Sequence, residues 1–139
     1  MEISGHWTGT IIFGKIYKEY QNKELYFDLE LIQNNENISG KAIDIGGIAM
    51  NPDPAIINGK IVTNKIQFIK QYISHHYYEN GAVKADKSKK GPEIRYFGTY
   101  NESDKTLSGD WEIILKVKLF GIIPIKISHG NGTWNMKRK

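Results

Sequence analysis

The chain contains no cysteine among its 139 residues. This absence excludes a disulfide framework and any metal site built from thiolates. It is typical of proteins in a reducing compartment, although exported proteins without cysteine also occur. The first ten residues hold no basic segment followed by an apolar run, so we expect no signal peptide and a cytoplasmic location.

Long apolar runs are also missing, and none approaches the ~18 residues that a membrane-spanning helix needs. The charge imbalance is small, with 19 Lys and Arg against 15 Asp and Glu, for a net charge of +4. Basic residues gather at 84–90 and 137–139, which we interpret as a solvated loop and a solvated tail. Neither segment interleaves basic residues with aromatic ones, so we expect no nucleic-acid partner. Because no apolar run is long enough, we also expect no membrane span.

The dominant positive signal is alternation with a period of two residues, clearest at 107–117. There the odd positions are apolar or glycine and the even positions mostly polar, as in an antiparallel strand with one face in water. Turn signals separate such runs, among them the rigid turn Asn51–Pro54, which we place at a rim. We expect strands at about 6–14, 24–34, 37–47, 56–62, 64–78, 93–101, 105–118 and 121–136.

This pattern predicts an all-β fold, a single antiparallel up-and-down β-barrel of about eight strands. No segment is typical of a long helix, and residues 15–23 are expected to hold one helical turn or a loop. A chain of this length is expected to form one domain, spanning residues 1–139, and to bury most of its unfolded surface. Because a closed barrel has no free strand edges, we expect a monomer.

Each tryptophan follows a glycine by two positions, in the pairs Gly5/Trp7, Gly109/Trp111 and Gly132/Trp134. Residues i and i+2 of a strand face the same side, so each glycine is expected to leave room beside an indole or to let the strand bend. Two of the pairs lie at opposite ends of the chain. We therefore expect the first and last strands to pair and close the barrel.

Gly5-His6-Trp7 resembles the Gly-x-Trp signature of the calycin superfamily, which includes lipocalins, cytosolic fatty-acid-binding proteins and avidins. The resemblance implies a tryptophan across the closed end of the barrel, with a basic side chain of the last strand stacked on it. Arg138 has the right parity for this role, and such a contact contributes roughly 0.5–2 kcal/mol. The Thr-Asp-Tyr motif of lipocalins and the helical pair of fatty-acid-binding proteins are absent, so the subfamily stays unassigned.

The predicted strand 64–78 offers the most informative polar side chains, Lys70 and His76 on its even-numbered face. If this face points inward, polar groups enter an aromatic interior, as in small-molecule pockets. We therefore expect a small, partly apolar ligand, oriented by Lys70 and His76. The residues predicted to hold it are Phe27, Phe68, Lys70, Tyr72, His76, Tyr96, Tyr100 and Trp111. Two alternatives remain open: the odd-numbered face is the inner one, or these polar residues are solvated at a strand end.

No metal ion or cofactor is expected. Adjacent His75 and His76 point to opposite faces of a strand, and His6 and His129 show no metal-ligand spacing. Residues 5–9 are also similar to the Gly-x-Trp-x-Gly element of nitrobindin-like haem barrels, a resemblance that implies a late histidine as axial ligand, here His129.

Two other functions stay open. The same pocket could serve an isomerase, lyase or hydrolase that uses Lys70, His76 or a tyrosine as acid or base. The sequence shows no nucleophile elbow, paired-carboxylate motif or phosphate-cradling glycine loop. Alternatively, side chains fill the barrel and the chain is an interaction module whose surface includes Tyr17, Tyr20 and Tyr26.

Overall fold

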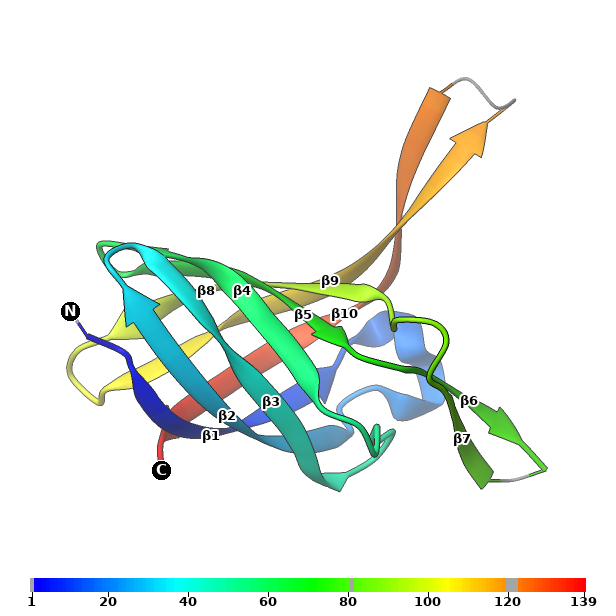
Figure 1. The fold of residues 1–139 in the computed structure, drawn as a ribbon, viewed down its shortest axis with the longest axis horizontal. Helices are drawn as coiled ribbons and strands as arrows, with labels where there is room; N and C mark the ends of the chain where they lie inside the picture. The colour runs from blue at the N-terminus through cyan, green and yellow to red at the C-terminus, as the bar shows by residue number, and fades with distance from the viewer. Residues whose placement is uncertain (1, 81, 120–122) are drawn as a thin grey trace.

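A closed antiparallel β-barrel forms the body of the molecule (Figure 1). The computed structural model describes residues 2–80, 82–119 and 123–139, with all their side chains except those of 76–78, 82–83, 114–119 and 123–129. Within this part the barrel strands are β1 (Gly5–Phe13), β2 (Glu24–Asn34), β3 (Asn37–Gly47), β4 (Ala55–Val62), β5 (Lys65–Tyr72), β8 (Glu93–Asn101), β9 (Thr106–Leu119) and β10 (Ile123–Arg138). They pair in the order β1-β10-β9-β8-β5-β4-β3-β2, and β2 returns to β1. The expectation of an all-β, eight-stranded, up-and-down barrel is confirmed.

Three further elements lie outside the barrel wall. The 3-10 helix η1 (Lys15–Tyr20) connects β1 to β2, and β6 (His75–Glu79) and β7 (Ala82–Asp86) form a separate hairpin between β5 and β8. In Figure 1, η1 and this hairpin lie at the end of the barrel away from both termini, where the β9–β10 hairpin also extends beyond the wall. We call this the open end, and the end beside the termini the closed end.

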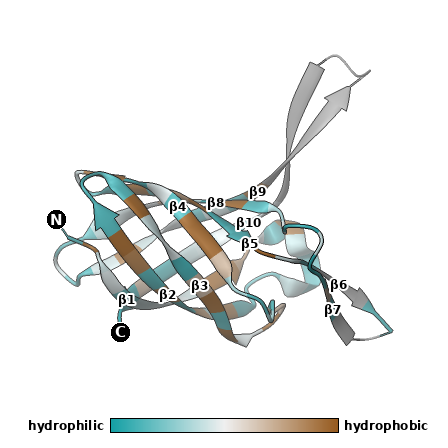
Figure 2. Ribbon diagram, viewed as in Figure 1, coloured by the Kyte–Doolittle hydropathy of each residue, from teal (hydrophilic) through white to brown (hydrophobic). Residues whose placement is uncertain are grey.

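Alternating burial follows the alternating sequence along the barrel strands, as the bands of hydropathy in Figure 2 show. On β2, Leu25, Phe27, Leu29 and Leu31 are buried, while the residues between them are exposed or half-buried. On β5 the even-numbered face points inward, as predicted. The described residues include no helix whose length and hydropathy would let it cross a lipid bilayer.

The closed end is built from the first residues of the chain and the last strand. β1 and β10 pair with Trp7 opposite Arg138, and the Arg138 guanidinium carbon lies 4.9 Å from the Trp7 ring centroid. The guanidinium also donates hydrogen bonds to the carbonyls of Ser4 and Glu2, at 2.7 and 2.6 Å. Trp7 Nε1 donates to the carbonyl of Ile3 at 2.9 Å, and both side chains are fully buried. The predicted stacking of Arg138 on Trp7 is confirmed.

Neither of the glycines before Trp111 and Trp134 makes room for the indole two residues later: Gly132 makes room for the indole of Trp111 on the neighbouring strand, and Gly109 makes room for the backbone at Phe97. In the β9–β10 register, Gly132 faces Trp111 and Gly109 faces Trp134. A Cβ atom at Gly132 would lie 2.7 Å from Trp111 Nε1, closer than such atoms approach in proteins. One Cβ at Gly98, opposite Gly109, would lie 2.6 Å from the Trp134 ring.

These two indoles are also held by hydrogen bonds to the backbone. Trp111 Nε1 donates to the carbonyl of Thr133 at 3.1 Å, and Trp134 Nε1 donates to those of Asp110 and Phe97 at 3.0 and 3.2 Å. A buried indole N–H needs such a partner. The contacts of the two indoles with glycines and backbone carbonyls therefore favour one register of β8, β9 and β10.

The predicted strand 64–78 is wrong as a single element. The chain bends at Ile73 and Ser74, and the residues that follow pair with β7 in the separate hairpin instead of continuing the barrel wall. The reason lies in the contacts at the bend: Ile73 N donates to the carbonyl of Pro54, and the buried Ser74 hydroxyl donates to Asp53 at 2.6 Å. Residues 84–86, interpreted as loop, are part of β7.

Truncation of Trp7 tests the closed end. We expect Trp7→Ala to lower the free energy of unfolding by roughly 3–5 kcal/mol, because it empties a fully buried site and leaves Arg138 without its ring. Ile32→Ala, on the exposed outer face of β2, is the control and is expected to stay within about 0.5 kcal/mol. Urea denaturation followed by tryptophan fluorescence measures both. A loss below about 1 kcal/mol for Trp7→Ala would show that this residue does not close the barrel.

A second prediction concerns the strand contacts at glycine. A Cβ at Gly109 would overlap the carbonyl oxygen of Phe97, a backbone atom that cannot move aside. A Cβ at Gly46 would meet only the half-exposed ring of Tyr26, at 3.3 Å. We expect Gly109→Ala to destabilise by about 1–3 kcal/mol and Gly46→Ala by less than about 0.5 kcal/mol in the same denaturation experiment. Equal losses would contradict the steric explanation.

Candidate functional site

Lys70 is a buried cation in the barrel interior. The alternation of β5 turns its side chain inward, and only 2% of it is exposed. Its strand neighbours across the sheet, Ile57 and Ile94, are both buried apolar residues. Lys70 Nζ has no hydrogen-bond partner within the described structure. Since buried polar groups in proteins are normally paired, this ammonium needs a specific explanation.

Three aromatic rings surround the Lys70 ammonium. Its Nζ lies 5.0 Å from the ring centroid of Tyr72, 5.3 Å from that of Phe27 and 5.6 Å from that of Tyr96. The faces of these rings attract a cation, but such contacts replace only part of its hydration. Burial lowers the pKa of Lys70 from 10.5 to about 8, and the charge of Asp44 opposes this shift.

Asp44 is the counter-charge of the interior, and sequence analysis missed it. It lies at an inward position of β3, half-buried. Tyr72 Oη donates to both carboxylate oxygens of Asp44, at 2.8 and 2.9 Å, and the backbone N–H of Asn51 donates to one of them at 2.8 Å. The available signal was parity: Ile38, Gly40, Ala42 and Asp44 share one face of the strand, so the carboxylate continues an inward-facing row.

Tyr96 supplies a second unpaired donor. Its side chain is 1% exposed, and its hydroxyl has no hydrogen-bond partner among the described residues. Its ring stacks on Phe68 at a centroid distance of 4.6 Å and meets Trp134 edge-on at 5.7 Å. Burial raises the pKa of Tyr96 well above its usual value, with a smaller contribution from Asp44. Burial and Asp44 raise the pKa of Tyr72 in the same way, so both phenols keep their protons.

The predicted turn Asn51–Pro54 is fixed by hydrogen bonds that involve the carboxylates of Asp44 and Asp53. Asp53 accepts a hydrogen bond from the buried Ser74, and its backbone N–H donates to the Asn51 side chain at 2.9 Å. Asn51 is itself 2% exposed and contacts Asp44 through its backbone. The turn is therefore a fixed wall of the open end.

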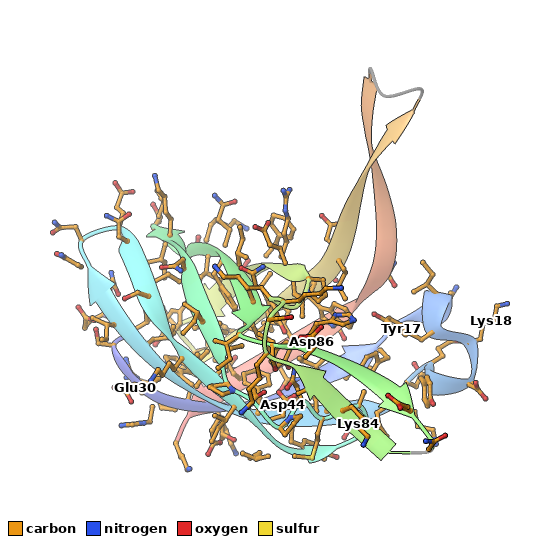
Figure 3. All side chains as sticks on the ribbon, turned by 45° about the vertical axis from the view of Figure 1, so that its right-hand side comes forward. Tyr17, Lys18, Glu30, Asp44, Lys84 and Asp86 are labelled. Carbon is orange, nitrogen blue, oxygen red and sulfur yellow. The ribbon has the colours of Figure 1, made fainter. Side chains whose placement is uncertain are left out.

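On the other side of the open end, η1 brings Tyr17 over the barrel. The Tyr17 ring lies 4.9 Å from Phe13 and 5.9 Å from Trp111, measured between centroids. Burial raises the pKa of Tyr17 to about 12. In Figure 3, Tyr17 and Lys18 mark η1 at this end, while Glu30 lies toward the closed end. Lys18 has a left-handed backbone conformation (φ 49°) that kinks η1 after Tyr17.

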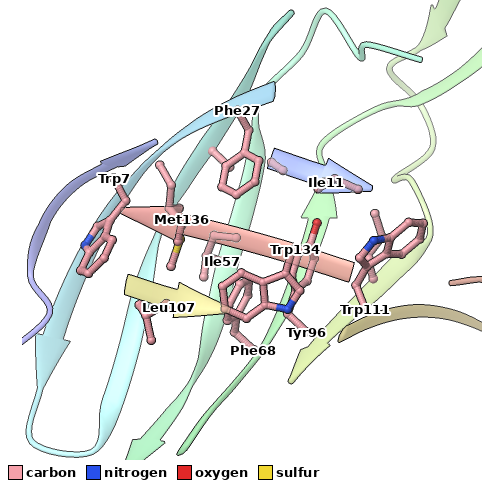
Figure 4. Close-up of a cluster of buried hydrophobic side chains, with 14 of the residues drawn as sticks. Trp7, Ile11, Phe27, Ile57, Phe68, Tyr96, Leu107, Trp111, Trp134 and Met136 are labelled. Carbon is pink, nitrogen blue, oxygen red and sulfur yellow. The ribbon is translucent and has the colours of Figure 1, made fainter. Parts of the chain in front are cut away.

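The predicted site residues fall into three groups. Most are buried in the interior, several of them visible in Figure 4: Phe27, Phe68, Lys70, Tyr72, Tyr96 and Trp111. Tyr100 is half-buried and lies at the opposite end of β8 from Ile94, the register partner of Lys70, so the structure separates it from the amine. His76 belongs to β6, outside the barrel sheet, and its side chain lies outside the described residues. Because the chain bends at Ser74, His76 does not belong to the strand that carries Lys70, and its part in binding stays a prediction.

Five hollows with a described lining lie on the outer surface of the barrel. The five whose lining is described follow grooves between outward-facing side chains, the largest about 610 Å³ beside Thr63, Asn64 and Tyr100. Among described side chains, no three His, Cys, Asp or Glu residues gather closely enough to hold a metal ion. His129, the residue implied by the haem resemblance, lies outside the described side chains.

The lowered pKa of Lys70 makes stability depend on pH. The unfolded chain binds this proton more readily than the folded one between pH 8 and 10.5, so folding becomes more favourable as pH rises through this window. We expect wild-type stability to rise by about 2 kcal/mol between pH 7 and 9.5 relative to Lys70→Met. Urea denaturation at both pH values measures the difference. Lys65→Met, at an exposed position of β5, is the control, and its stability should change with pH as that of the wild type does. If Lys70→Met shows the same pH dependence as the wild type, the ammonium of Lys70 is not buried without compensation.

Comparison with known proteins adds no relative. No family model matches the chain, and no curated protein or solved structure matches it either. The identity of the site therefore depends on its own geometry.

Proposed function

We propose that the barrel binds a small, partly apolar molecule in its interior, with an acceptor group of that molecule placed at Lys70 and Tyr96. The observation that carries this proposal is the pair of buried donors, Lys70 Nζ and Tyr96 Oη, which have no hydrogen-bond partner within the described structure. Leaving either donor unpaired costs roughly 1–3 kcal/mol, and more for the charged one. A ligand carboxylate or carbonyl oxygen would accept from both and recover that cost.

The walls around these donors favour an apolar or aromatic ligand body. Phe27, Tyr72 and Tyr96 surround the amine, and large apolar walls with few polar groups are typical of small-molecule sites. On the side of β5 away from β8, two small residues lie in the wall, where Ala42 of β3 pairs with Ala55 of β4 and both are buried. Room for a ligand would lie on this side, because the opposite wall is filled by interlocked indoles.

We further propose that the barrel is of the calycin type. Three features support this: eight antiparallel strands, a Gly-x-Trp signature on β1, and Arg138 of the last strand stacked on Trp7. In this arrangement the closed end is sealed by Ile3 and Trp7, so a ligand would enter at the open end, between η1 and the turn at Asn51.

A second candidate is an interaction module with a side-chain-filled barrel. The observation that favours it is the position of the described hollows, which all lie on the outer surface. One of about 520 Å³ lies beside the half-exposed Phe97 and is lined by Val62 and Lys65. Ligand binding decides between the two candidates.

The test begins with the purified protein. Native and denaturing mass spectrometry, with an absorption spectrum of the same sample, should show an excess mass that is lost on unfolding; a Soret band would instead indicate haem. Binding of trans-cinnamate, an aromatic carboxylate, is then measured by quenching of tryptophan fluorescence. We expect saturable binding that weakens at least about tenfold in Lys70→Met, because roughly 1.4 kcal/mol or more of charge-assisted hydrogen bonding is lost.

Two control variants sharpen this test. Lys65→Met removes an exposed lysine from the outward face of the same strand and should leave the affinity unchanged. Tyr96→Phe removes only the unpaired hydroxyl and should weaken binding by a smaller factor than Lys70→Met. An apo mass together with no saturable binding, or equal affinities in Lys70→Met and Lys65→Met, would reject the interior site and favour the interaction module.

A further inference from the structure

We propose that Lys70 is a carbonyl-reactive amine and that the molecules held in the barrel are aldehydes, bound through a reversible imine with its Nζ. This inference rests on the proposed function, because it uses the same interior site. It goes further in naming the ligand class and the bond that holds it.

A lysine becomes a nucleophile where its amine is desolvated and no strong acceptor holds its protons. Lys70 meets both conditions: its side chain is 2% exposed, and Nζ has no hydrogen-bond partner among the described residues. The nearby carboxylate of Asp44 is occupied by the hydroxyl of Tyr72 and the N–H of Asn51. The negative charge of Asp44 acts on Lys70, but no described group accepts a hydrogen bond from Nζ.

The titratable groups that act on Lys70 come from three strands. Asp44 of β3 supplies a negative charge, Tyr72 of β5 and Tyr96 of β8 remain neutral phenols, and β2 contributes only the ring of Phe27. Desolvation outweighs the effect of Asp44 and lowers the pKa of Lys70 to about 8. Near pH 7 the neutral amine is then roughly two orders of magnitude more abundant at Lys70 than at a solvated lysine.

The chemistry balances without an oxidant, a reductant or a second substrate. The lone pair of neutral Nζ attacks the carbonyl carbon, and the carbonyl π electrons move to oxygen, which takes up a proton. Nitrogen then loses a proton, and a second proton is added to the new hydroxyl. The carbon–oxygen bond breaks, water leaves, and a protonated carbon–nitrogen double bond forms, which becomes the neutral imine when nitrogen loses its remaining proton. Amine and aldehyde give imine and one water, and hydrolysis reverses each step.

Two residues would assist the formation of the imine. The hydroxyl of Tyr96, which has no other partner in the described interior, is the donor available to the carbonyl oxygen and to the departing hydroxyl. Asp44 supplies the negative charge that stabilises a protonated imine, and Tyr72 holds the carboxylate in place at 2.8 and 2.9 Å. The three surrounding rings limit the access of water, so hydrolysis of the imine is slowed.

The experiment uses trans-cinnamaldehyde with sodium cyanoborohydride, which reduces an imine to a stable secondary amine, followed by peptide mapping of the full-length protein. We expect Lys70 to be modified at least about tenfold faster than Lys65, which is exposed on the same strand. Excess trans-cinnamate should slow the modification of Lys70 alone. The comparison is made between two lysines of the wild-type protein, so it does not depend on whether a variant folds.

Two variants complete the design. Lys70→Arg keeps the charge but cannot form the imine, and should lose the fast modification; Lys65→Arg should retain it. If cinnamate binds in a Lys70-dependent manner but Lys70 and Lys65 are modified at similar rates, the imine is overturned while the binding function stands. If neither cinnamate nor cinnamaldehyde binds, both proposals fail together.

Discussion

Closure of the sheet is the constraint on which the rest of the molecule depends. Pairing of β1 with β10 leaves every barrel strand hydrogen-bonded on both sides, so the wall has no free edge. Arg138 ties this seam to the first residues of the chain by stacking on Trp7 and bonding the carbonyls of Glu2 and Ser4. Without the seam, the interior would open to water and the lysine inside would be an ordinary solvated cation.

The two halves of the wall serve different purposes. On the β8–β9–β10 side, the indole of Trp111 lies against Gly132 and that of Trp134 against Gly98, and they donate to the carbonyls of Thr133 and Asp110, which fixes register and fills space. On the β3–β4 side the inward residues include the paired Ala42 and Ala55, and one inward residue of β3, Asp44, is charged.

The sequence predicts most of this fold because alternation and turn residues are local signals. The barrel follows from these signals, and its seam follows from the glycine–tryptophan pairs near both ends. Alternation alone left open which face of β5 points inward, and the structure shows that it is the even-numbered one. The end of β5 could not be predicted in this way, because the bend at Ser74 depends on Asp53. This residue is distant in sequence and accepts the hydrogen bond of Ser74 only in the folded chain. Asp44 was missed for a related reason: parity places it inside, but its importance comes from Tyr72 on another strand.

The placement of Lys70 and Tyr96 in the interior could be anticipated, but their lack of partners could not. A sequence shows which residues face inward, and it does not show which donors remain unsatisfied after packing. His76 shows a different error: the alternation was extended beyond the bend, and it assigned His76 to the barrel sheet although this residue lies in the separate β6–β7 hairpin.

The seam between β1 and β10 has a consequence for how the chain acquires its structure. Trp7 and Arg138 lie far apart in the sequence, yet they are direct neighbours across the sheet. Hairpins from β2 to β9 can form as they emerge, whereas the barrel stays open along one side until β10 is available. Contacts of such large sequence separation slow folding and leave edges exposed in the meantime. The sheet of a nascent chain therefore stays incomplete until β10 has been made, and pairing of β10 with β1 completes it.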